Sequence, residues 1–414
     1  MPRSNEVLDN AGAFDVYIGS IVRRGYAPAP QMPEKSLPGR AGDFVNSRTF
    51  SLRLVSFCLI SLAAAALLCA DDAAEHKRHL SAFPFAVYST DIGVGFGGIA
   101  KMVNILRRDE ALALSLFYST KSEHWYLLTF SIPDFQIRQG KRYGLSLDVK
   151  VEYDKYLKYY FYGIGPDSQR LGTDIDSYAT YLMQQVSLTF GHAFNPALAI
   201  EAAYVLREYR TSNVAPDREY TDLLTNEGNK FSPFLSLTLR YDTSNSQIHP
   251  TRGVRFSLQN DFAAQALGNK AGTFYRWTLD LRAYHRVFGE KDAVSVRGLA
   301  QDVIGSNVPL WDLSMLGGGS TMSALRGYVL NRFMDNGKFL VCAEYRFPIW
   351  KRIGGTVFTE GGLVWPLLRD VDLKKIAYDA GFGLRYFLSD FVVRADIGFS
   401  HEGIGIYFNA GQMF

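Results

Sequence analysis

Several motifs in this sequence match the residue patterns of known binding or catalytic sites. Each of these sites requires a particular secondary structure around the motif. Residues 93–98 read GVGFGG, the spelling of a dinucleotide-binding loop, which must open a helix in order to bind phosphate. No helical period follows this stretch, so we interpret it as a glycine-rich first strand. The chain contains no GK[ST] phosphate loop, no HExxH zinc helix, no GxSxG nucleophile turn and no CxxC pair.

The cysteines and histidines form no catalytic set. Cys58 and Cys69 fall in an apolar leader segment, which leaves Cys342 as the one thiol further along the chain. No histidine lies near it in the sequence, so we interpret Cys342 as a small packing residue rather than a nucleophile. Single histidines in strands or turns, such as His192, His249 and His285, favour no ligand set. We therefore expect no enzyme activity, no cofactor and no metal site.

The segment 306–337 carries the most informative polar motif. It reads LGGGS at 316–320 and LRGY at 325–328. A loop of this length is uncommon and is usually functional or disordered. Its glycines allow sharp turns, and Arg326 can make a bidentate contact with a carboxylate. The alternative is an arginine in a solvated loop.

Composition indicates the elements that must position such a loop. The 414 residues are 47% hydrophobic, 14% aromatic and 21% charged, with a formal net charge of +3. The balanced charge, without a basic cluster, predicts no nucleic-acid binding. The aromatic residues fall mostly in short segments in which apolar and polar side chains alternate, which is the period of a β-strand.

The last third of the chain shows this alternation best. In 339–349 one face carries large apolar side chains, and the other includes Glu344 and Arg346. The same pattern recurs in 378–388 and 391–400. In 404–414, Ile406, Phe408 and Phe414 are expected on one face. Strands of about 9–11 residues with apolar side chains outward and charges inward are typical of a transmembrane barrel.

A sheet in lipid must close, because an open edge leaves unpaired N–H and C=O groups in hydrocarbon. Fifteen strands can be assigned along the chain, and bacterial barrels have an even number. We therefore predict an all-β, transmembrane antiparallel barrel of sixteen strands over 93–414, with the missing strand in 153–165. Short turns at 195–197 and 289–292 contrast with long loops at 166–178, 212–230 and 306–337, as expected for periplasmic turns and outer loops.

The N-terminal residues indicate export. Residues 48–70 combine a basic flank, an apolar core and a small residue before two aspartates, which predicts a cleaved signal peptide. Cys69 allows a lipoprotein, but Leu68 is too bulky for the usual lipidation motif. Residues 1–47 are interpreted as an over-extended or disordered leader, with Val45 as a possible alternative start. Residues 71–92 are expected to be a short periplasmic lead-in.

With these features the sequence resembles the BamA/TamA-like superfamily of outer-membrane assembly factors, also called bacterial surface antigens. The resemblance covers most of residues 84–414. It is carried by LGG at 316–318 with LRGY at 325–328, by AEYRFPI at 343–349, FTEG at 358–361 and GFGLR at 381–385, and by the last strand. Shorter support comes from 88–93, 161–165 and 250–253.

The resemblance implies a site. The loop before the last five strands folds into the barrel lumen, and its motif, Leu325, Arg326, Gly327 and Tyr328, is held there by acids of the two following strands. Those acids are Glu344 and Glu360 here. The last strand, with Ile406, Phe408 and Phe414, resembles the signal that barrels present for their own insertion, although Gln412 stands where an aromatic residue is usual.

The resemblance leaves the function between two hypotheses. Roughly twenty residues separate Ala70 from the first expected strand, too few for a folded periplasmic POTRA module, so the chain resembles a barrel-only branch. The first hypothesis is an insertase or translocation barrel that opens a weak seam beside a glycine-rich first strand. The second is a passive pore or structural surface protein. Its expected lumen charges are Asp280, Arg282, Arg297, Arg385, Arg394 and Asp396.

The expected partners follow from the membrane location. They are outer-membrane lipids and lipopolysaccharide, the barrel-assembly machinery during the chain's own insertion, and client polypeptides or lipids. We expect a monomer in the bacterial outer membrane.

Overall fold

The computed structural model describes residues 78–121, 123–172, 175–289, 292–387 and 392–414. The leader expected at 1–47 and the signal peptide expected at 48–70 lie outside the described residues. Across the described ranges, no helix has both the length and the apolar character needed to cross a bilayer.

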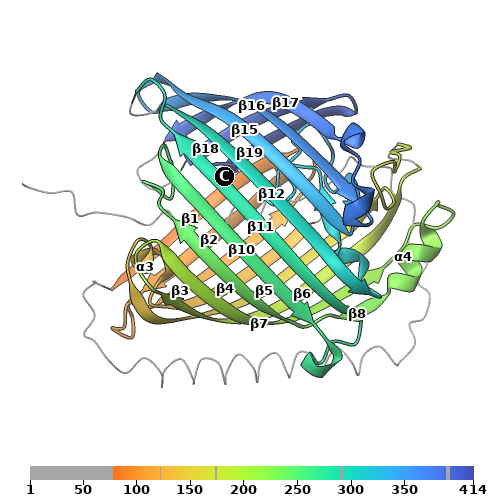
Figure 1. The fold of residues 1–414 in the computed structure, drawn as a ribbon, viewed down its shortest axis with the longest axis horizontal. Helices are drawn as coiled ribbons and strands as arrows, with labels where there is room; N and C mark the ends of the chain where they lie inside the picture. Colours follow the sequence, from red (N-terminus) through yellow and green to blue (C-terminus); the bar gives the residue numbers. More distant parts are fainter. Residues whose placement is uncertain (1–77, 122, 173–174, 290–291, 388–391) are drawn as a thin grey trace, which may run out of the picture.

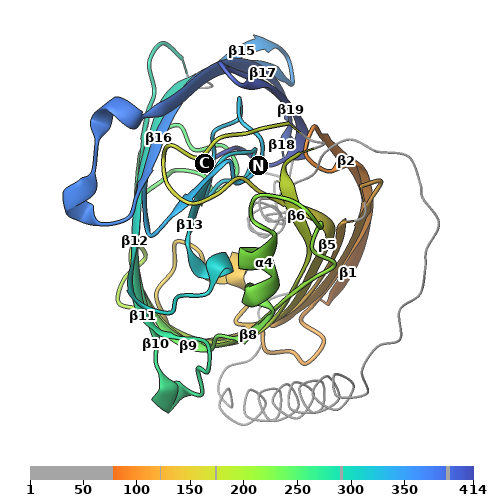
Figure 2. The same ribbon diagram turned by 90° about the vertical axis from the view of Figure 1, so that its right-hand side faces the viewer.

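The long strands form one sheet that closes on itself (Figures 1 and 2). The sheet has seventeen strands, of which the three-residue β8 (Asn229–Phe231) pairs with β7 ahead of β9, so the barrel is sixteen strands round. The sixteen strands are β1 (His79–Ser89), β2 (Gly93–Val103), β3 (Ala111–Ser119), β4 (Glu123–Ile132), β5 (Tyr143–Phe161), β6 (Ser177–Ala193), β7 (Leu198–Ser212), β9 (Phe234–Asp242), β10 (Gly253–Ala263), β11 (Thr273–His285), β12 (Ala293–Ser306), β15 (Gly337–Trp350), β16 (Ile353–Trp365), β17 (Ala377–Phe387), β18 (Val392–Ser400) and β19 (Gly403–Ala410).

Each long strand pairs antiparallel with its neighbours in the sequence, and β1 returns to β19 to close the ring. The prediction of a sixteen-stranded antiparallel barrel is therefore confirmed. The short helices lie in the connections between strands. They are α3 (Phe135–Arg138), α4 (Thr221–Glu227), η1 (Gln265–Leu267), η2 (Leu310–Asp312), η3 (Leu368–Asp370) and η4 (Leu373–Lys375).

The connections divide between two rims, which we name the α3 rim and the α4 rim after the helices at the two ends of Figure 1. Antiparallel order places the three long loops, 162–176, 213–233 and 307–336, on the α4 rim. It places the turns 194–197 and 286–292 on the α3 rim. The asymmetry expected from the sequence is present, and it fits outer loops on the α4 rim.

Side chains alternate between the two faces of the wall as predicted. On β15, Phe339 and Val341 are exposed, whereas Leu340, Cys342 and Glu344 are buried inside. On β17, Phe382 and Leu384 face outward and Arg385 faces inward. The outer face is therefore apolar enough for hydrocarbon, while the inner face carries charges that need partners.

The sixteenth strand does not lie where the sequence placed it. It is β1, within the segment 71–92 that was expected to be a periplasmic lead-in. The stretch 153–161, where the missing strand was expected, is instead the end of the long strand β5. The alternation failed to reveal β1 because Phe85 and Val87 put apolar side chains on its inner face and Pro84 interrupts it.

The glycine-rich segment is consequently the second strand, β2, and not the first. It pairs along its whole length with β1 and for most of its length with β3. The prediction that glycines weaken the seam through poor pairing of the opening strand is therefore wrong. The junction between the first and last strands lies on the other side of β1, where β1 pairs with β19.

The end of the chain also departs from the predicted pattern. Ile406 and Phe408 face outward on β19, but the strand ends at Ala410. Gly411 takes a positive φ of 83°, and Phe414 is buried inside the barrel. The expectation that Phe414 shares a face with Ile406 and Phe408 is wrong, because the turn at Gly411 breaks the period of two.

Candidate functional site

The loop 307–336 lies inside the ring of strands, as the inward position of β13 in Figure 2 shows. It contains η2 and the two-stranded ribbon of β13 (Ser314–Leu316) and β14 (Phe333–Asp335). An isolated bridge joins Gly318 to Leu325 and folds the tip back on itself. Gly317 and Gly318 both take positive φ, which explains why glycines stand at this fold-back.

Arg326 at the loop tip binds three carboxylates from three strands. Its guanidinium lies 2.8 Å from Glu344 on β15, 2.8 Å from Glu360 on β16 and 3.0 Å from Asp396 on β18. The four side chains are fully buried. The main-chain N–H of Arg326 also donates to Glu360 at 2.7 Å. Every charge in this group has a partner, which is the condition for keeping ions away from water.

An aromatic ring completes the arginine site. The Phe358 ring on β16 lies under the guanidinium, 3.3 Å from the Arg326 Cζ atom to the ring centroid. Phe358 and Glu360 share the inner face of β16, so an apolar ring and a carboxylate from the same strand contact one cation. Stacking on the face of a ring suits the flat guanidinium better than the ammonium of lysine.

A floor of glycines allows the loop backbone to approach the wall. Gly381, Gly398 and Gly405 stand side by side on β17, β18 and β19. A Cβ atom at Gly398 would lie 2.5 Å from the carbonyl carbon of Arg326, and one at Gly405 would collide with the Arg326 carbonyl oxygen. The wall is therefore smooth where the loop main chain lies on it.

The rest of the LRGY motif fits the same wall. Gly327 donates its N–H to Asp379 on β17 at 2.6 Å, and a Cβ atom there would lie 2.7 Å from the main chain of Phe399. The Tyr328 hydroxyl hydrogen-bonds with the Tyr378 carbonyl at 3.3 Å and with His401 at 3.0 Å. Burial, with the nearby carboxylates of Glu402 and Asp379, raises the pKa of Tyr328 to about 12, so its hydroxyl stays protonated.

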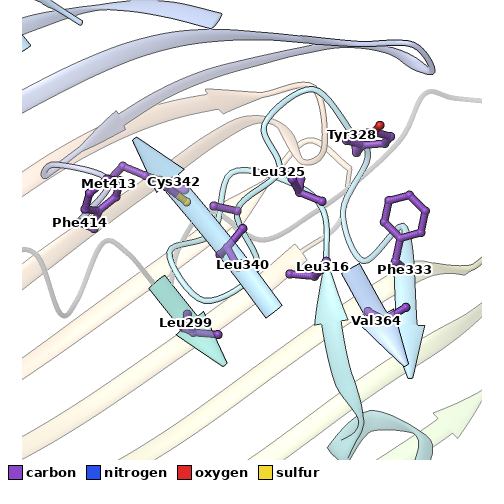
Figure 3. Close-up of a cluster of buried hydrophobic side chains, with 11 residues drawn as sticks. Leu299, Leu316, Leu325, Tyr328, Phe333, Leu340, Cys342, Val364, Met413 and Phe414 are labelled. Atoms are coloured by element: carbon purple, nitrogen blue, oxygen red, sulfur yellow. The ribbon is translucent and has the colours of Figure 1, made fainter. Parts of the chain in front are cut away.

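Apolar contacts hold the loop to the interior as well. Leu325 and Tyr328 belong to a buried cluster that we name the lumen cluster (Figure 3). It joins the loop, the inner faces of β12, β15 and β16, and the last two residues of the chain. Its members are Leu299, Leu316, Ala324, Leu325, Tyr328, Phe333, Leu340, Cys342, Val364, Met413 and Phe414. Cys342 is one of these buried packing residues.

Asp312 forms a second anchor at the start of the loop, which the sequence analysis did not identify. It accepts from Arg207 at 2.9 Å, from the Tyr209 hydroxyl at 3.1 Å and from the Ser232 hydroxyl at 2.8 Å. Trp311 beside it packs against Tyr159 of β5, with ring centroids 4.6 Å apart. The tyrosine-rich end of β5 is thus a packing surface for the loop and not a separate strand.

We expect Asp312→Ala to loosen the start of the loop without releasing its tip. Arg276 lies 3.4 Å from Asp312 and keeps a second partner, Asp261, at 2.7 Å. Only part of the local charge pairing is therefore lost, and the expected cost is about 1–3 kcal/mol. Limited proteolysis of the folded protein should cleave faster within 307–313. The exposed-loop variant Asp370→Ala is the control. Equal cleavage of the two variants would show that Asp312 does not hold the loop.

The structure brings some of the site residues expected from the sequence into contact and separates others. Glu344 and Glu360 contact Arg326, whereas Ile406 and Phe408 face outward and Phe414 lies in the lumen cluster. Asp396, which we expected from the sequence only as a charge of the lumen, is the third acid that contacts Arg326. Asp396 and Asp379 could have been found from their shared inward face beside Arg385 and Arg394.

Comparison with known proteins agrees with this geometry. Residues 104–414 match the Omp85 superfamily domain. The fold is similar to BamA from Haemophilus ducreyi lacking POTRA domains 1–3, with a TM-score of 0.60 and 16% identity over 81% of this chain and 70% of that one.

Two solved CdiB structures are similar in the same way. The match to CdiB from Escherichia coli has a TM-score of 0.57 and 11% identity over 81% of this chain and 63% of that one. For CdiB from Acinetobacter baumannii the TM-score is 0.54, with 12% identity over 80% of this chain and 59% of that one. At these low identities, the TM-scores show a shared fold alone. Comparison with curated protein sequences finds no significant match.

Proposed function

This chain belongs to the Omp85 superfamily, and from that premise we propose that it opens the seam between β1 and β19 to insert or translocate polypeptides or lipids at the outer membrane. One observation carries the proposal. Within the part of the chain that the structure describes, the two strands pair only at Tyr88↔Phe408 and Ser89↔Tyr407, supplemented by a 3.0 Å bond from the Thr90 N–H to the Ile406 carbonyl. On its other side, β1 pairs with β2 from His79 to Ser89.

The short seam leaves one edge of β1 available. Among the described residues, 79–87 of β1 have strand partners only on the β2 side. In hydrocarbon each unpaired main-chain group costs several kcal/mol, so this edge favours another strand as its partner. A client strand could pair there before it leaves laterally into the bilayer. Pro84 lies in β1, and strand prolines are typical of such edges.

The inner wall gives less support to a passive pore. The charges that suggested a wet channel mostly pair with one another, as Arg297 does with Asp280 at 2.6 Å and Arg385 with Asp396 at 2.5 Å. Arg297 also donates to the carbonyl of Thr321 in the inward loop. These side chains hold the loop and each other, which is a different role from lining an open path.

A disulfide across the seam should abolish the proposed activity. Tyr88 and Phe408 are register partners and both face outward, so Tyr88→Cys with Phe408→Cys in a Cys342→Ala background can join β1 to β19. In cells depleted of the wild-type protein, the locked variant should fail to restore the outer-membrane protein and lipid composition. A reductant should restore it. Quantitative proteomics and lipid analysis of isolated outer membranes measure both.

The matched control keeps one of the two cysteines. Ala395→Cys with Phe408→Cys joins β18 to β19 within a long ladder, and it should leave function intact. Full complementation by the oxidised seam variant would show that the seam need not open. If depletion changes neither proteins nor lipids, and the purified wild-type protein conducts ions in planar bilayers, the chain is a pore.

A further inference from the structure

The connection between β16 and β17 projects outward from the barrel at the α4 rim. β16 ends at Trp365 and β17 begins at Ala377, and residues 366–376 between them contain the short helices η3 and η4. Figure 2 shows this segment, in blue beside β16, outside the ring of strands, and Figure 1 shows it level with the strand ends of the α4 rim. We name residues 366–376 the paddle.

The paddle exposes large apolar side chains. Leu368 is 63% exposed and Leu373 is 68% exposed, and Leu367 and Ile376 are exposed as well. Single apolar residues on a surface are ordinary, but a contiguous group of them marks an interaction site. Three exposed leucines within residues 367–373 therefore indicate that the paddle has an apolar partner.

Contacts near both ends of the paddle fix its position on the barrel. The Pro366 carbonyl accepts a hydrogen bond from the Asn336 side-chain amide at 2.9 Å. At the other end, Lys375 pairs with Asp167 of the loop 162–176. Between these contacts η3 and η4 each close a hydrogen-bonded turn. The outward position of the leucines is therefore set by the fold.

The apolar surface of the paddle continues the lipid-facing wall of the barrel. On β17 the exposed Phe382 and Leu384 lie between two exposed tyrosines, Tyr378 toward the α4 rim and Tyr386 toward the α3 rim. Aromatic residues that flank an apolar band are typical of the two membrane–water interfaces of a barrel. Tyr378 therefore marks the interface at the α4 rim, and Ile376 of the paddle is two residues away from it.

The charges of the paddle suit the same interface. Its basic residues are Arg369, Lys374 and Lys375, and its acidic residues are Asp370 and Asp372. Long basic side chains can lie along apolar surface and keep their charge at the level of the lipid headgroups. Amphipathic segments at an interface bury their apolar face roughly 5–10 Å into the boundary between headgroups and acyl chains. A sideways projection at the rim has this depth within reach.

We propose that the paddle is an interfacial membrane anchor, which places Leu367, Leu368 and Leu373 among the acyl chains of the outer leaflet at the α4 rim. Lipid is the partner because the exposed leucines continue the lipid-facing surface of β17 and project sideways from it, away from the lumen. The proposal goes beyond the seam activity and does not depend on it. It requires only that the barrel spans a membrane.

Site-directed fluorescence in a bilayer tests the proposal. Leu368→Cys carries a small dye in the full chain, with Cys58, Cys69 and Cys342 replaced by alanine. The folded protein is placed in nanodiscs of phosphatidylcholine, in which both membrane faces are open to solvent. A lipid with a nitroxide on the upper part of its acyl chain quenches a dye that lies among the lipids, and iodide quenches a dye that lies in water.

Two labelled sites calibrate the measurement. A dye at Phe382→Cys on the outer wall should be quenched by the nitroxide lipid and protected from iodide. A dye at Asn226→Cys, an exposed residue of α4 at the same rim, should show the reverse. The dye at Leu368→Cys should behave as the dye on the wall. Because all three sites carry the same dye, its own affinity for lipid cannot explain a difference between residues 368 and 226.

A substitution within the paddle tests whether its leucines hold it in the membrane. Burial of one leucine shifts the equilibrium between the inserted and the exposed paddle by about tenfold or more. Leu373→Ser in the labelled Leu368→Cys chain should therefore cause a loss of protection from iodide. Leu223→Ser removes an exposed leucine of α4 instead and should leave the quenching at residue 368 unchanged.

Three results overturn the proposal. Iodide quenching at residue 368 equal to that at residue 226 would place the paddle in water. Protection from both quenchers would show that protein covers it. Lipid quenching that Leu373→Ser leaves unchanged would show that the leucines do not anchor it. If Leu368→Cys fails to fold on heat-modifiability gels, Leu367→Cys carries the dye with the same expected results. The seam-lock experiment is read separately and keeps its own outcome.

Discussion

Arg326→Glu should prevent the barrel from reaching its stable folded form. The substitution replaces the one cation that Glu344, Glu360 and Asp396 share by a fourth carboxylate in a fully buried site. Removing one partner of a buried ion pair costs about 3–5 kcal/mol, and a like charge among three acids costs more. The measurement is heat-modifiability on gels, in which a folded barrel migrates differently from the boiled chain, together with surface abundance in cells.

Two further variants serve as comparisons, one with a conservative substitution at the same site and one with the same change of charge at an exposed site. Arg326→Lys keeps the charge but loses the planar fork and the stack on Phe358, so it should fold with lower stability. Arg369→Glu changes the same charge on a side chain that is 81% exposed, and it should behave as wild type. An Arg326→Glu chain that is as heat-modifiable and as abundant as wild type would show that the loop does not stabilise the barrel.

Gly398→Ala should displace the loop from the wall while leaving all charges in place. The added Cβ atom would lie 2.5 Å from the Arg326 carbonyl carbon and 2.7 Å from the Gly327 nitrogen. Both are main-chain atoms that cannot rotate away, so we expect a cost at the upper end of the about 1–3 kcal/mol that overpacking usually produces. The loss should appear as a lower midpoint in urea unfolding and as faster proteolysis within 307–336.

The matched control is a glycine on the outer face of the barrel wall, where its register partners Leu281 and Val341 are exposed. A Cβ atom at Gly298 on β12 would meet nothing within 4 Å, so Gly298→Ala should leave the unfolding midpoint unchanged. The two variants add the same methyl group to a strand glycine, but Gly398 faces the loop inside the barrel, whereas Gly298 faces outward and meets no other atom. Equal midpoints for the two variants would contradict the close fit of the loop on its glycine floor.

The two predictions address different forces at one site. Arg326→Glu tests the charges, and Gly398→Ala tests the approach of the two main chains. Both forces act between the loop tip and β15–β19, the strands that lead up to the seam. A loop held on these strands can stabilise the wall next to the short pairing of β1 and β19, which fits the proposed opening between these two strands.

Much of the fold could be predicted because its signal is local. A strand exposes alternate residues to opposite faces. The apolar Phe339 and the charged Glu344 therefore indicate which face of their strand lies toward lipid and which toward the lumen, whichever strands pair with it. Closure of the sheet followed from the same local pattern, because a whole strand edge left unpaired in hydrocarbon costs several kcal/mol for each main-chain group. The family resemblance added the pairing of Arg326 with Glu344 and Glu360, which no local period contains.

The sequence by itself determined the barrel, the inward and outward faces of its later strands, and the special character of the LRGY loop. The tertiary structure alone decided that β1 is the sixteenth strand, that Asp396 and Asp312 hold the loop, and that Phe414 lies in the lumen. The physical reason is the range of the forces. The alternation of side chains depends only on residues that are adjacent in the sequence. The buried ion pairs, the contact of the loop with the wall glycines and the position of Phe414 depend on groups that meet only after the sheet has closed.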